Sequence, residues 1–194
     1  MPHIDPLDRS ELPQFEQLFS RYDEIRGFLP NSILTMARRP AIAEAFMKLN
    51  QAILYEGSVP ESLKMMIALM TSMATGCRYC QGHMANLSHV YGLSDEKIAA
   101  IWDCETSGEF TDAEKAALVL AREAAGVPNT VEAKHFEKLK PHFSEAEIVE
   151  IVGSIALFGY LNRWNDTMST TMEHHPEQIA RTVMPEWDAG KHKG

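Results

Sequence analysis

The feature that most constrains the fold of this chain is the spacing of its apolar residues, which recur at steps of three and four along most of its length. Three stretches show it: Phe15, Leu18, Phe19, Tyr22 and Ile25; Ile42, Phe46, Leu49 and Ile53; and Leu63, Met66, Ile67, Met70 and Met73. This period gathers apolar side chains on one face of an α-helix. We see no convincing alternation typical of a strand, so the sequence predicts an all-α fold, a single-domain helical bundle.

Residues that favour helix ends divide the chain into short helices. Thr111 with Glu114 and Ser144 with Glu147 have the spacing of capping boxes, and Gly76 suits a helix C-terminus. We expect helices over residues 10–26, 30–38, 40–56, 60–75, 77–92, 94–104, 111–126, 131–140 and 145–172. A chain of 194 residues suits one domain with a sizeable core. We therefore assign residues 1–194 to a single domain, with loose ends at 1–9 and 185–194.

Charge and hydropathy exclude several classes of partner. Acidic residues outnumber basic ones, 27 against 18, which gives a formal charge of -9 at pH 7, whereas nucleic-acid binding needs a concentrated cationic face. No apolar run approaches the roughly 20 residues that cross a bilayer, and the first residues do not resemble a signal peptide. We therefore predict a cytoplasmic protein that binds neither nucleic acid nor membrane.

Two of the three cysteines lie close together. Residues 76–83 read Gly-Cys-Arg-Tyr-Cys-Gln-Gly-His, so Cys77 and Cys80 are one helical turn apart, while Cys104 stands alone. If Gly76 ends one helix, both cysteines fall in the first turn of the next, where backbone N–H groups and the helix dipole favour a thiolate. His83 follows on the same face. In a reducing compartment, such a pair indicates redox chemistry or metal binding rather than a structural disulfide.

These side chains suggest a peroxide-reducing cycle. A Cys80 thiolate would attack a peroxide oxygen, Cys77 would resolve the resulting sulfenic acid to a disulfide, and His83 would move the proton. An external dithiol would then restore the thiols. A zinc site would use Cys77, Cys80, His83 and His89, but two residues between Cys80 and His83 leave no loop to fold these ligands around a tetrahedral centre. Two unrelated core cysteines are the plainer alternative, and we expect neither metal nor cofactor.

The cysteine motif resembles that of the alkylhydroperoxidase D and carboxymuconolactone decarboxylase superfamily, in particular its peroxidase-related branch. Residues 159–168, Gly-Tyr-Leu-Asn-Arg-Trp-Asn-Asp-Thr-Met, are also similar to that branch, and together the matches cover about residues 60–175. The resemblance implies an all-helical subunit that assembles into dimers, trimers or hexamers. It also implies thiol-dependent reduction of a hydroperoxide, in which the second cysteine attacks and the first resolves.

Two positions depart from alkylhydroperoxidase D. Its histidine lies four residues after the second cysteine, where this chain has Met84; His83 comes one position earlier, a rotation of about 100° around the helix. Its glutamate lies twelve residues before the first cysteine, where this chain has Met65. Three acids are candidates to replace that glutamate: Glu61, Asp166 and Glu173. Glu61 also fits a plain first-turn acid at a helix N-terminus.

The apolar stripe of the predicted helix over 145–172 becomes polar in its last turns. Since buried polar groups need partners, Asn162, Arg163 and Asp166 would form a hydrogen-bonded floor beneath the cysteine helix or cross a subunit interface. The alternative is that they are solvated where the helix leaves the core. The His-His-Pro sequence at 174–176 indicates the end of this helix.

Three functions are consistent with these features. The leading hypothesis is a thiol-dependent peroxidase or disulfide oxidoreductase that reduces hydroperoxides through Cys77, Cys80 and His83. The resemblance also implies decarboxylation of a lactone acid, for which a Cys-x-x-Cys pair has no evident use. The non-enzymatic alternative is a helical oligomer that senses oxidants through the same disulfide.

Overall fold

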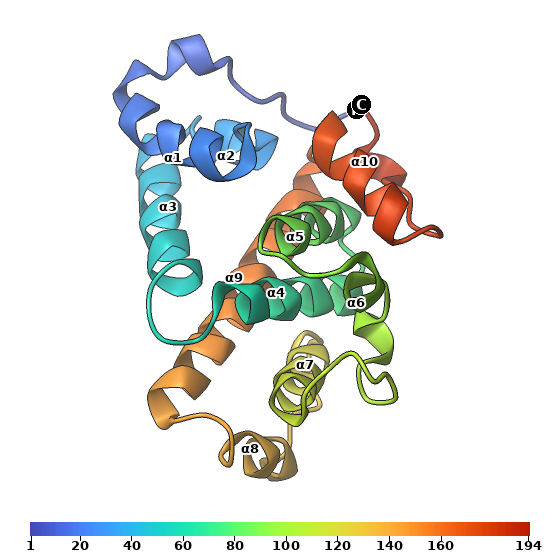
Figure 1. Cartoon of the computed structure of the whole chain (residues 1–194). Helices are drawn as coiled ribbons and strands as arrows, with labels where there is room; N and C mark the ends of the chain where they lie inside the picture. The colour runs from blue at the N-terminus through green and yellow to red at the C-terminus, as the bar shows by residue number, and fades with distance from the viewer.

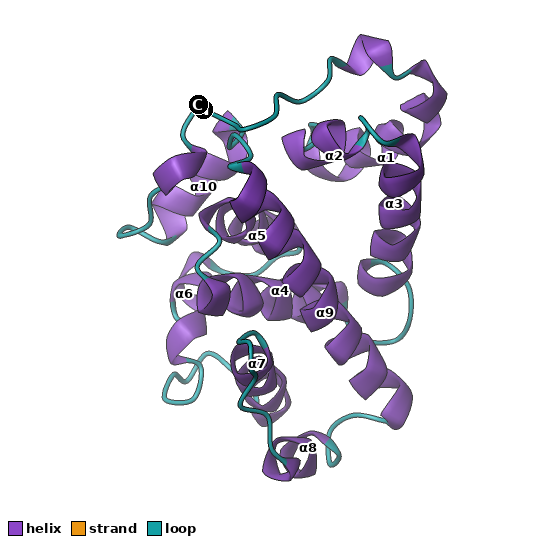
Figure 2. Ribbon diagram, turned by 180° about the vertical axis from the view of Figure 1, so that it is seen from behind, coloured by secondary structure: helices purple, strands orange, loops and turns teal.

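The described part of the protein is built from ten α-helices and contains no β-strand (Figure 2). The structure, a computed structural model, describes the backbone of residues 1–194 and every side chain except that of Arg21. The helices are α1 (Glu16–Arg26), α2 (Asn31–Met36), α3 (Pro40–Leu54), α4 (Glu61–Thr75), α5 (Arg78–Val90), α6 (Asp95–Ala99), α7 (Asp112–Ala124), α8 (Ala133–Leu139), α9 (Glu145–Met168) and α10 (His174–Val183). The predicted all-α class is confirmed. Among the described helices, none has the length and apolar character that crossing a membrane requires.

Helix α4 forms the centre of the bundle. It packs against α5, α7 and α9, and its residues from Leu63 to Ser72 are all buried. Helix α5 lies between α4 and α10 and also contacts α9 (Figure 1). The helix that carries the cysteine motif is therefore enclosed by three others, which explains why its side chains from Tyr79 to Ser88 are buried.

Helix ends that depend on local chemistry lie where the sequence predicts them. Gly76 ends α4 in the left-handed conformation, with φ of 77°, which glycine adopts without steric cost. Thr111 with Glu114 and Ser144 with Glu147 form reciprocal capping boxes at the starts of α7 and α9. Because Gly76 turns the chain at once, α5 begins two residues later.

The chain after α9 differs from the expected helix end at 174–176. Ser169 caps α9 in the left-handed conformation, with φ of 50°, and turns the chain back towards α5. His174 then begins α10, whose side chains Ala180 and Val183 are buried. The apolar face of α10 packs on α5, so the residues that suggested a helix end instead start a new helix.

Both termini, expected to be loose, contact the rest of the protein. In the segment 185–194, Trp187 and His192 are buried because the apolar side chains after α10 fold back over the bundle. The backbone N–H of Met172 donates to the carbonyl of His192 at 2.8 Å. At the other end, the backbone N–H of His3 donates to the Met168 carbonyl at 3.0 Å.

Candidate active site

The two cysteines of the motif lie at the N-terminus of α5. Cys77 is the N-cap, one position before the first turn in which it was expected, and Cys80 lies in that turn. Both are free thiols, only 1% and 3% exposed, and they are hydrogen-bonded to each other. Adjacent free sulfurs can form and break a disulfide with little movement of the backbone. Cys104 is also free and buried, at the end of the short turn Ile101–Asp103.

Their surroundings make the two thiols unequal acids. The hydrogen bond from the Cys80 thiol lowers the pKa of Cys77, against the opposing effect of burial. Burial raises the pKa of Cys80 well above its ordinary value, and Cys77 raises it further. A hydrogen bond from Asn165 Nδ2 to the Cys80 sulfur, at 3.4 Å, lowers the pKa of Cys80 and so opposes these two effects. Cys77 is therefore the more easily ionised thiol, and Cys80 needs a proton acceptor before it can attack.

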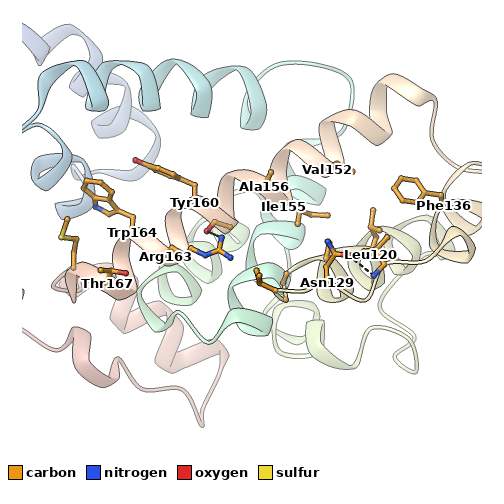
Figure 3. Close-up of a pocket in the computed structure, with 17 residues that line it drawn as sticks. Leu120, Asn129, Phe136, Val152, Ile155, Ala156, Tyr160, Arg163, Trp164 and Thr167 are labelled. Atoms are coloured by element: carbon orange, nitrogen blue, oxygen red, sulfur yellow. Dashed lines mark hydrogen bonds between the residues drawn. The ribbon is translucent and has the colours of Figure 1, made fainter.

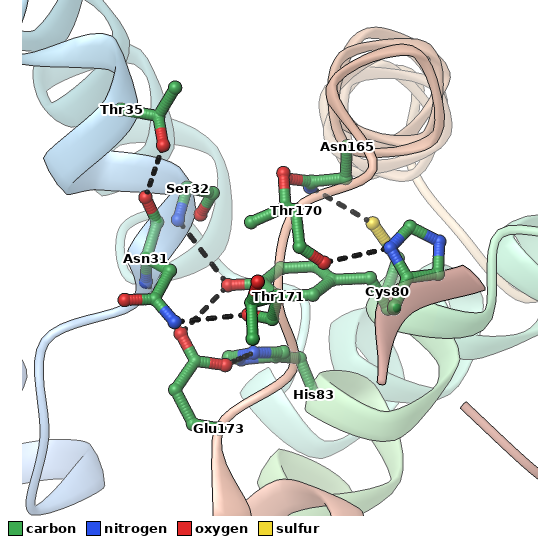
Figure 4. A network of polar contacts seen from close by, with 11 residues as sticks. Asn31, Ser32, Thr35, Cys80, His83, Asn165, Thr170, Thr171 and Glu173 are labelled. Atoms are coloured by element: carbon green, nitrogen blue, oxygen red, sulfur yellow. Dashed lines mark hydrogen bonds and ion pairs between the residues drawn. The ribbon is translucent and has the colours of Figure 1, made fainter. Parts of the chain in front are cut away.

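A buried imidazole and carboxylate lie beside this pair. His83 Nε2 is 2.7 Å from Glu173 Oε2, and the other oxygen of Glu173 accepts hydrogen bonds from the Tyr79 hydroxyl and the Asn31 backbone (Figure 4). Burial alone would raise the pKa of Glu173, but the charge and hydrogen bond of His83 outweigh it, so that pKa lies below its ordinary value. The carboxylate stays charged and fixes the orientation of the imidazole.

The structure distinguishes the three acids that the sequence left open. Glu173 contacts His83. Glu61 is exposed in the first turn of α4, and Asp166 lies beside Cys77. Met65, which stands where alkylhydroperoxidase D has its glutamate, is fully buried in the core. The acid therefore comes from the segment after α9 rather than from α4.

Cys80 and His83 line one small cavity of about 40 Å³. Such a volume suits a water or a molecule of similar size, whereas a cavity that binds benzene is about 150 Å³. Tyr22, Arg26 and Asn50 line both this cavity and a groove of about 610 Å³. These three residues therefore lie at the boundary between the cavity beside Cys80 and the groove.

Cys77 faces a different region. It lines a groove of about 350 Å³ together with Arg163 and Asp166. The Cys77 sulfur, a carboxylate oxygen of Asp166 and a ring nitrogen of His192 all lie within 4.8 Å of one another. Sequence reasoning missed His192, because it lies in a segment expected to be loose.

The polar residues near the end of α9 take separate roles. Asn162 is buried and accepts a hydrogen bond from Ser72 Oγ at 3.1 Å. Arg163 is exposed and donates to a backbone carbonyl of its own helix. Asp166 is half exposed and pairs with Lys191. The residue that reaches Cys80 is Asn165, three positions after Asn162, and extending the polar stripe by one helical step finds it.

A larger pocket lies along α9 and shares Gly159 and Arg163 with the groove beside Cys77. Its volume is about 990 Å³, and Tyr160, Arg163 and Trp164 of α9 lie along it, with Phe136 of α8 at one end (Figure 3). None of the described residues that line it is a cysteine, a histidine or an acid. Because it lacks groups for redox or proton-transfer chemistry, we place the candidate active site at the cysteine pair.

Comparisons with known proteins agree with the fold. The carboxymuconolactone decarboxylase family matches residues 40–123, and no significant match was found among curated proteins. The crystal structure of the debrominase Bmp8 is 36% identical, with a TM-score of 0.87 over 93% of this chain and 97% of that chain.

Two further crystal structures are similar. A cysteine-to-alanine variant of Bmp8 in complex with 2,3,4-tribromopyrrole is 35% identical, with a TM-score of 0.87 over 93% of this chain and 96% of that chain. A peroxidase-related protein of Ralstonia eutropha with an alkylhydroperoxidase core has the same fold at 23% identity, with a TM-score of 0.80 over 90% of this chain and 94% of that chain. The chain therefore belongs to the carboxymuconolactone decarboxylase family, within the alkylhydroperoxidase D-like superfamily.

Proposed function

We propose that this protein is a thiol-dependent peroxidase that reduces hydroperoxides by converting Cys77 and Cys80 to a disulfide. The observation that carries the proposal is the combination of two adjacent free thiols with a buried His83–Glu173 pair, in which Cys80 and His83 line one cavity. Cleavage of an O–O bond requires two electrons, and formation of one disulfide from two thiols supplies them.

In the first step, Cys80 attacks because it faces the cavity. His83, held by Glu173, takes the thiol proton directly or through one water. The Cys80 sulfur bonds to the outer oxygen of the hydroperoxide, and the O–O bond breaks. The leaving alkoxide takes the proton from His83, which gives an alcohol, or water from hydrogen peroxide, and a sulfenic acid at Cys80.

In the second step, Cys77 resolves the sulfenic acid. Its lowered pKa favours the thiolate, which attacks the Cys80 sulfur. The S–S bond forms, the S–O bond breaks, and the hydroxide that leaves takes a proton and becomes water. An external dithiol then reduces the disulfide through a mixed disulfide, and the groove beside Cys77 supports an approach from that side.

A second candidate is reductive removal of a halogen from an aromatic ring. The similarity to the debrominase Bmp8, 35% identity over 93% of this chain, favours it. The same thiols balance this reaction: the Cys80 sulfur takes the halogen, the ring carbon takes a proton, and Cys77 displaces halide to form the disulfide. The cavity of about 40 Å³ must widen several-fold to admit a ring, since a cavity that binds benzene is about 150 Å³. Hydrogen peroxide needs no such opening, so the peroxide ranks first.

A steady-state assay tests these candidates side by side. Hydrogen peroxide, tert-butyl hydroperoxide and 2,3,4-tribromopyrrole are each supplied with dithiothreitol or dihydrolipoamide. We expect sustained consumption of peroxide that requires both Cys77 and Cys80 and does not require Cys104. Bromide release without peroxide consumption would favour the second candidate. Oxidation that stops after one equivalent would favour a redox sensor, and lactone-acid decarboxylation without either cysteine of the pair would favour a decarboxylase.

We also propose that copies of the chain assemble into a homo-oligomer, a dimer, trimer or hexamer, in the cytoplasm. Exposed apolar side chains lie along α9, namely Val149, Val152 and Tyr160, and the last two also line the pocket of about 990 Å³. Clustered exposed apolar surface is typical of protein–protein contacts. Light scattering of the purified protein gives the mass in solution, and a monomer at micromolar concentration would contradict the assembly.

A further inference from the structure

The last turn of the chain brings a second histidine to the cysteine pair. His192 lies in the short turn Gly190–His192 and is 1% exposed. Two hydrogen bonds hold this turn against the segment after α9: Met172 N–H to the His192 carbonyl at 2.8 Å, and Ser169 Oγ to the Lys191 carbonyl at 3.1 Å. The position of the ring is therefore fixed by backbone contacts on both sides.

Hydrogen bonding also fixes which ring nitrogen of His192 has a free lone pair. Nδ1 is 2.8 Å from the backbone carbonyl oxygen of Thr170. A carbonyl can only accept, so Nδ1 carries a proton, and in the neutral ring the lone pair is on Nε2. Nε2 is buried and has no hydrogen-bond partner among the described residues. Burial lowers the pKa of His192, so the ring is neutral near pH 7 and presents an unused base.

The His192 ring lies close to Cys77. Its Nε2 is 3.7 Å from Asp166 Oδ1, and a ring nitrogen of His192, a carboxylate oxygen of Asp166 and the Cys77 sulfur all lie within 4.8 Å of one another. The other oxygen of Asp166 is 2.8 Å from the Lys191 ammonium, and the Tyr79 ring centre is 5.8 Å from that of His192. Of these neighbours, the Cys77 thiol is the acid whose pKa lies nearest to that of an imidazole.

We propose that His192 is a second proton-transfer group, which serves Cys77 as His83 serves Cys80. This rests on the proposed disulfide chemistry. In the resolving step, His192 takes the Cys77 proton, the S–S bond forms as the S–O bond breaks, and the released hydroxide recovers that proton as water. Asp166 stabilises the imidazolium that exists between these events.

The same group acts in reverse when the disulfide is reduced. One thiol of the external dithiol loses its proton to solvent and attacks the Cys77 sulfur as a thiolate, and Cys80 leaves and takes a proton from solvent through His83. The second thiol of the reductant loses its proton to His192 and attacks the reductant's own sulfur in the mixed disulfide. Cys77 then leaves as a thiolate and takes the proton from His192, so the protein returns to two thiols.

The three groups also have the donor atoms of a metal site. However, the Lys191 ammonium already neutralises the Asp166 carboxylate at 2.8 Å. A cation bound there would be repelled by this ammonium at short range. Proton transfer therefore accounts for the unpartnered Nε2 better than metal binding does.

The test measures Cys77 directly and uses no peroxide. In a Cys80→Ser, Cys104→Ser background, Cys77 is the one remaining cysteine, and its alkylation by iodoacetamide is followed from about pH 5 to about pH 9. We expect His192→Gln to lower the rate constant at neutral pH by about tenfold and to move the inflection upward by about one pH unit. His89→Gln is the matched control, since His89 is exposed and 3.2 Å from Asp95, and should change neither quantity. An unchanged profile in His192→Gln overturns the proposal.

Imidazole ¹⁵N spectroscopy of the unsubstituted reduced protein provides a second measurement that does not depend on a variant folding. We expect the His192 ring to be neutral near pH 7, with its proton on Nδ1. A proton on Nε2 overturns the proposal. If no substrate is turned over but the alkylation shift is found, the proposed function fails while His192 remains the base that serves Cys77. If substrate is turned over but the alkylation shift is absent, the proposed function stands and the proposed role of His192 fails.

Discussion

Each side of the cysteine pair has one histidine and one acidic residue, but the two histidine–acid pairs differ in their separation and in the volume of the space beside them. On the side of the second cysteine, His83 and Glu173 are 2.7 Å apart, and His83 lines a cavity of about 40 Å³. On the side of the first, His192 and Asp166 are 3.7 Å apart, and Asp166 lines a groove of about 350 Å³. Both acids come from the chain at or after the end of α9.

This difference teaches that one pair of sulfurs can serve two kinds of reactant. On the side of Cys80, the cavity has room only for a small molecule, and the burial of Glu173 strengthens its hydrogen bonds. On the side of Cys77, Asp166 is half exposed, and solvent weakens its interactions. A small oxidant fits the first environment, and a bulkier dithiol fits the second.

Removing either sulfur should have the largest effect on peroxide turnover, and it distinguishes the role of Cys80 from that of Cys77. Cys80→Ser and Cys77→Ser should each lower steady-state peroxide turnover by about a thousandfold or more, because each removes a reacting atom. A single turnover distinguishes them. Cys77→Ser should leave a sulfenic acid at Cys80 that dimedone traps, whereas Cys80→Ser should leave none. Cys104→Ser is the control, and a sulfenic acid at Cys77 in the unsubstituted protein would reverse the assigned roles.

Glu173→Gln tests whether proton transfer by His83, on the side of Cys80, depends on the Glu173 carboxylate. We expect kcat to fall by about a hundredfold, since the amide cannot stabilise a protonated His83 as the carboxylate does. Glu150→Gln is a matched control: Glu150 is likewise paired with a buried basic side chain, Lys64, at 2.9 Å, but it lines neither the cavity of Cys80 nor the groove of Cys77. It should lower the melting temperature and leave kcat of the folded protein unchanged. Equal losses of kcat in both variants would show that Glu173 is merely structural.

Asn165→Ala should have a smaller effect. Its amide hydrogen bond lowers the pKa of Cys80 against the effect of burial, so its loss should raise that pKa further and slow the attack on peroxide about fivefold. Stopped-flow oxidation measured against pH gives both quantities. Asn162→Ala is the control on the same helix, because its contact is with Ser72. A rate that falls as much in the control would assign the effect to packing.

The dependence of stability on pH supplies a reference pair outside the site. Burial raises the pKa of Glu150, but hydrogen bonds from Ser58 and Lys64 outweigh it and hold that pKa at about 2 instead of 4.5. A carboxyl whose pKa is depressed by folding stabilises the folded state above its unfolded pKa, and this stability is lost as the pH falls from 4.5 towards 2. Glu150→Gln should flatten this part of the unfolding free energy curve without changing activity. If the unfolding free energy of Glu150→Gln still falls to the same extent between pH 4.5 and 2, the depressed pKa of Glu150 is contradicted.

The parts of the structure that depend on neighbouring residues could be predicted from sequence. The capping boxes at Thr111 and Ser144 and the turn at Gly76 are local interactions, and they fix where helices begin and end. Cys77 and Cys80 follow from the turn at Gly76, because α5 begins at once. Their placement at a helix N-terminus therefore needs no knowledge of the rest of the fold.

The partners of these residues could not be predicted in the same way. Glu173 meets His83 across 90 residues of sequence, and no spacing rule relates them. Their contact depends on a non-glycine residue, Ser169, that turns the chain in the left-handed conformation. His192 depends on the same turn and on α10, neither of which has a clear signal in the sequence. The sequence thus identified the two sulfurs that we propose react, while the fold supplies the acids and the second imidazole.

The most direct test of the central claim is to map the thiols after one equivalent of hydrogen peroxide. The reduced protein is oxidised, its free thiols are labelled, and its peptides are analysed by mass spectrometry. We predict that two thiols are lost per chain, that they belong to Cys77 and Cys80 joined as a disulfide, and that dithiothreitol restores both while Cys104 stays free throughout. Thiols that remain unchanged, or a disulfide that includes Cys104, would contradict the account.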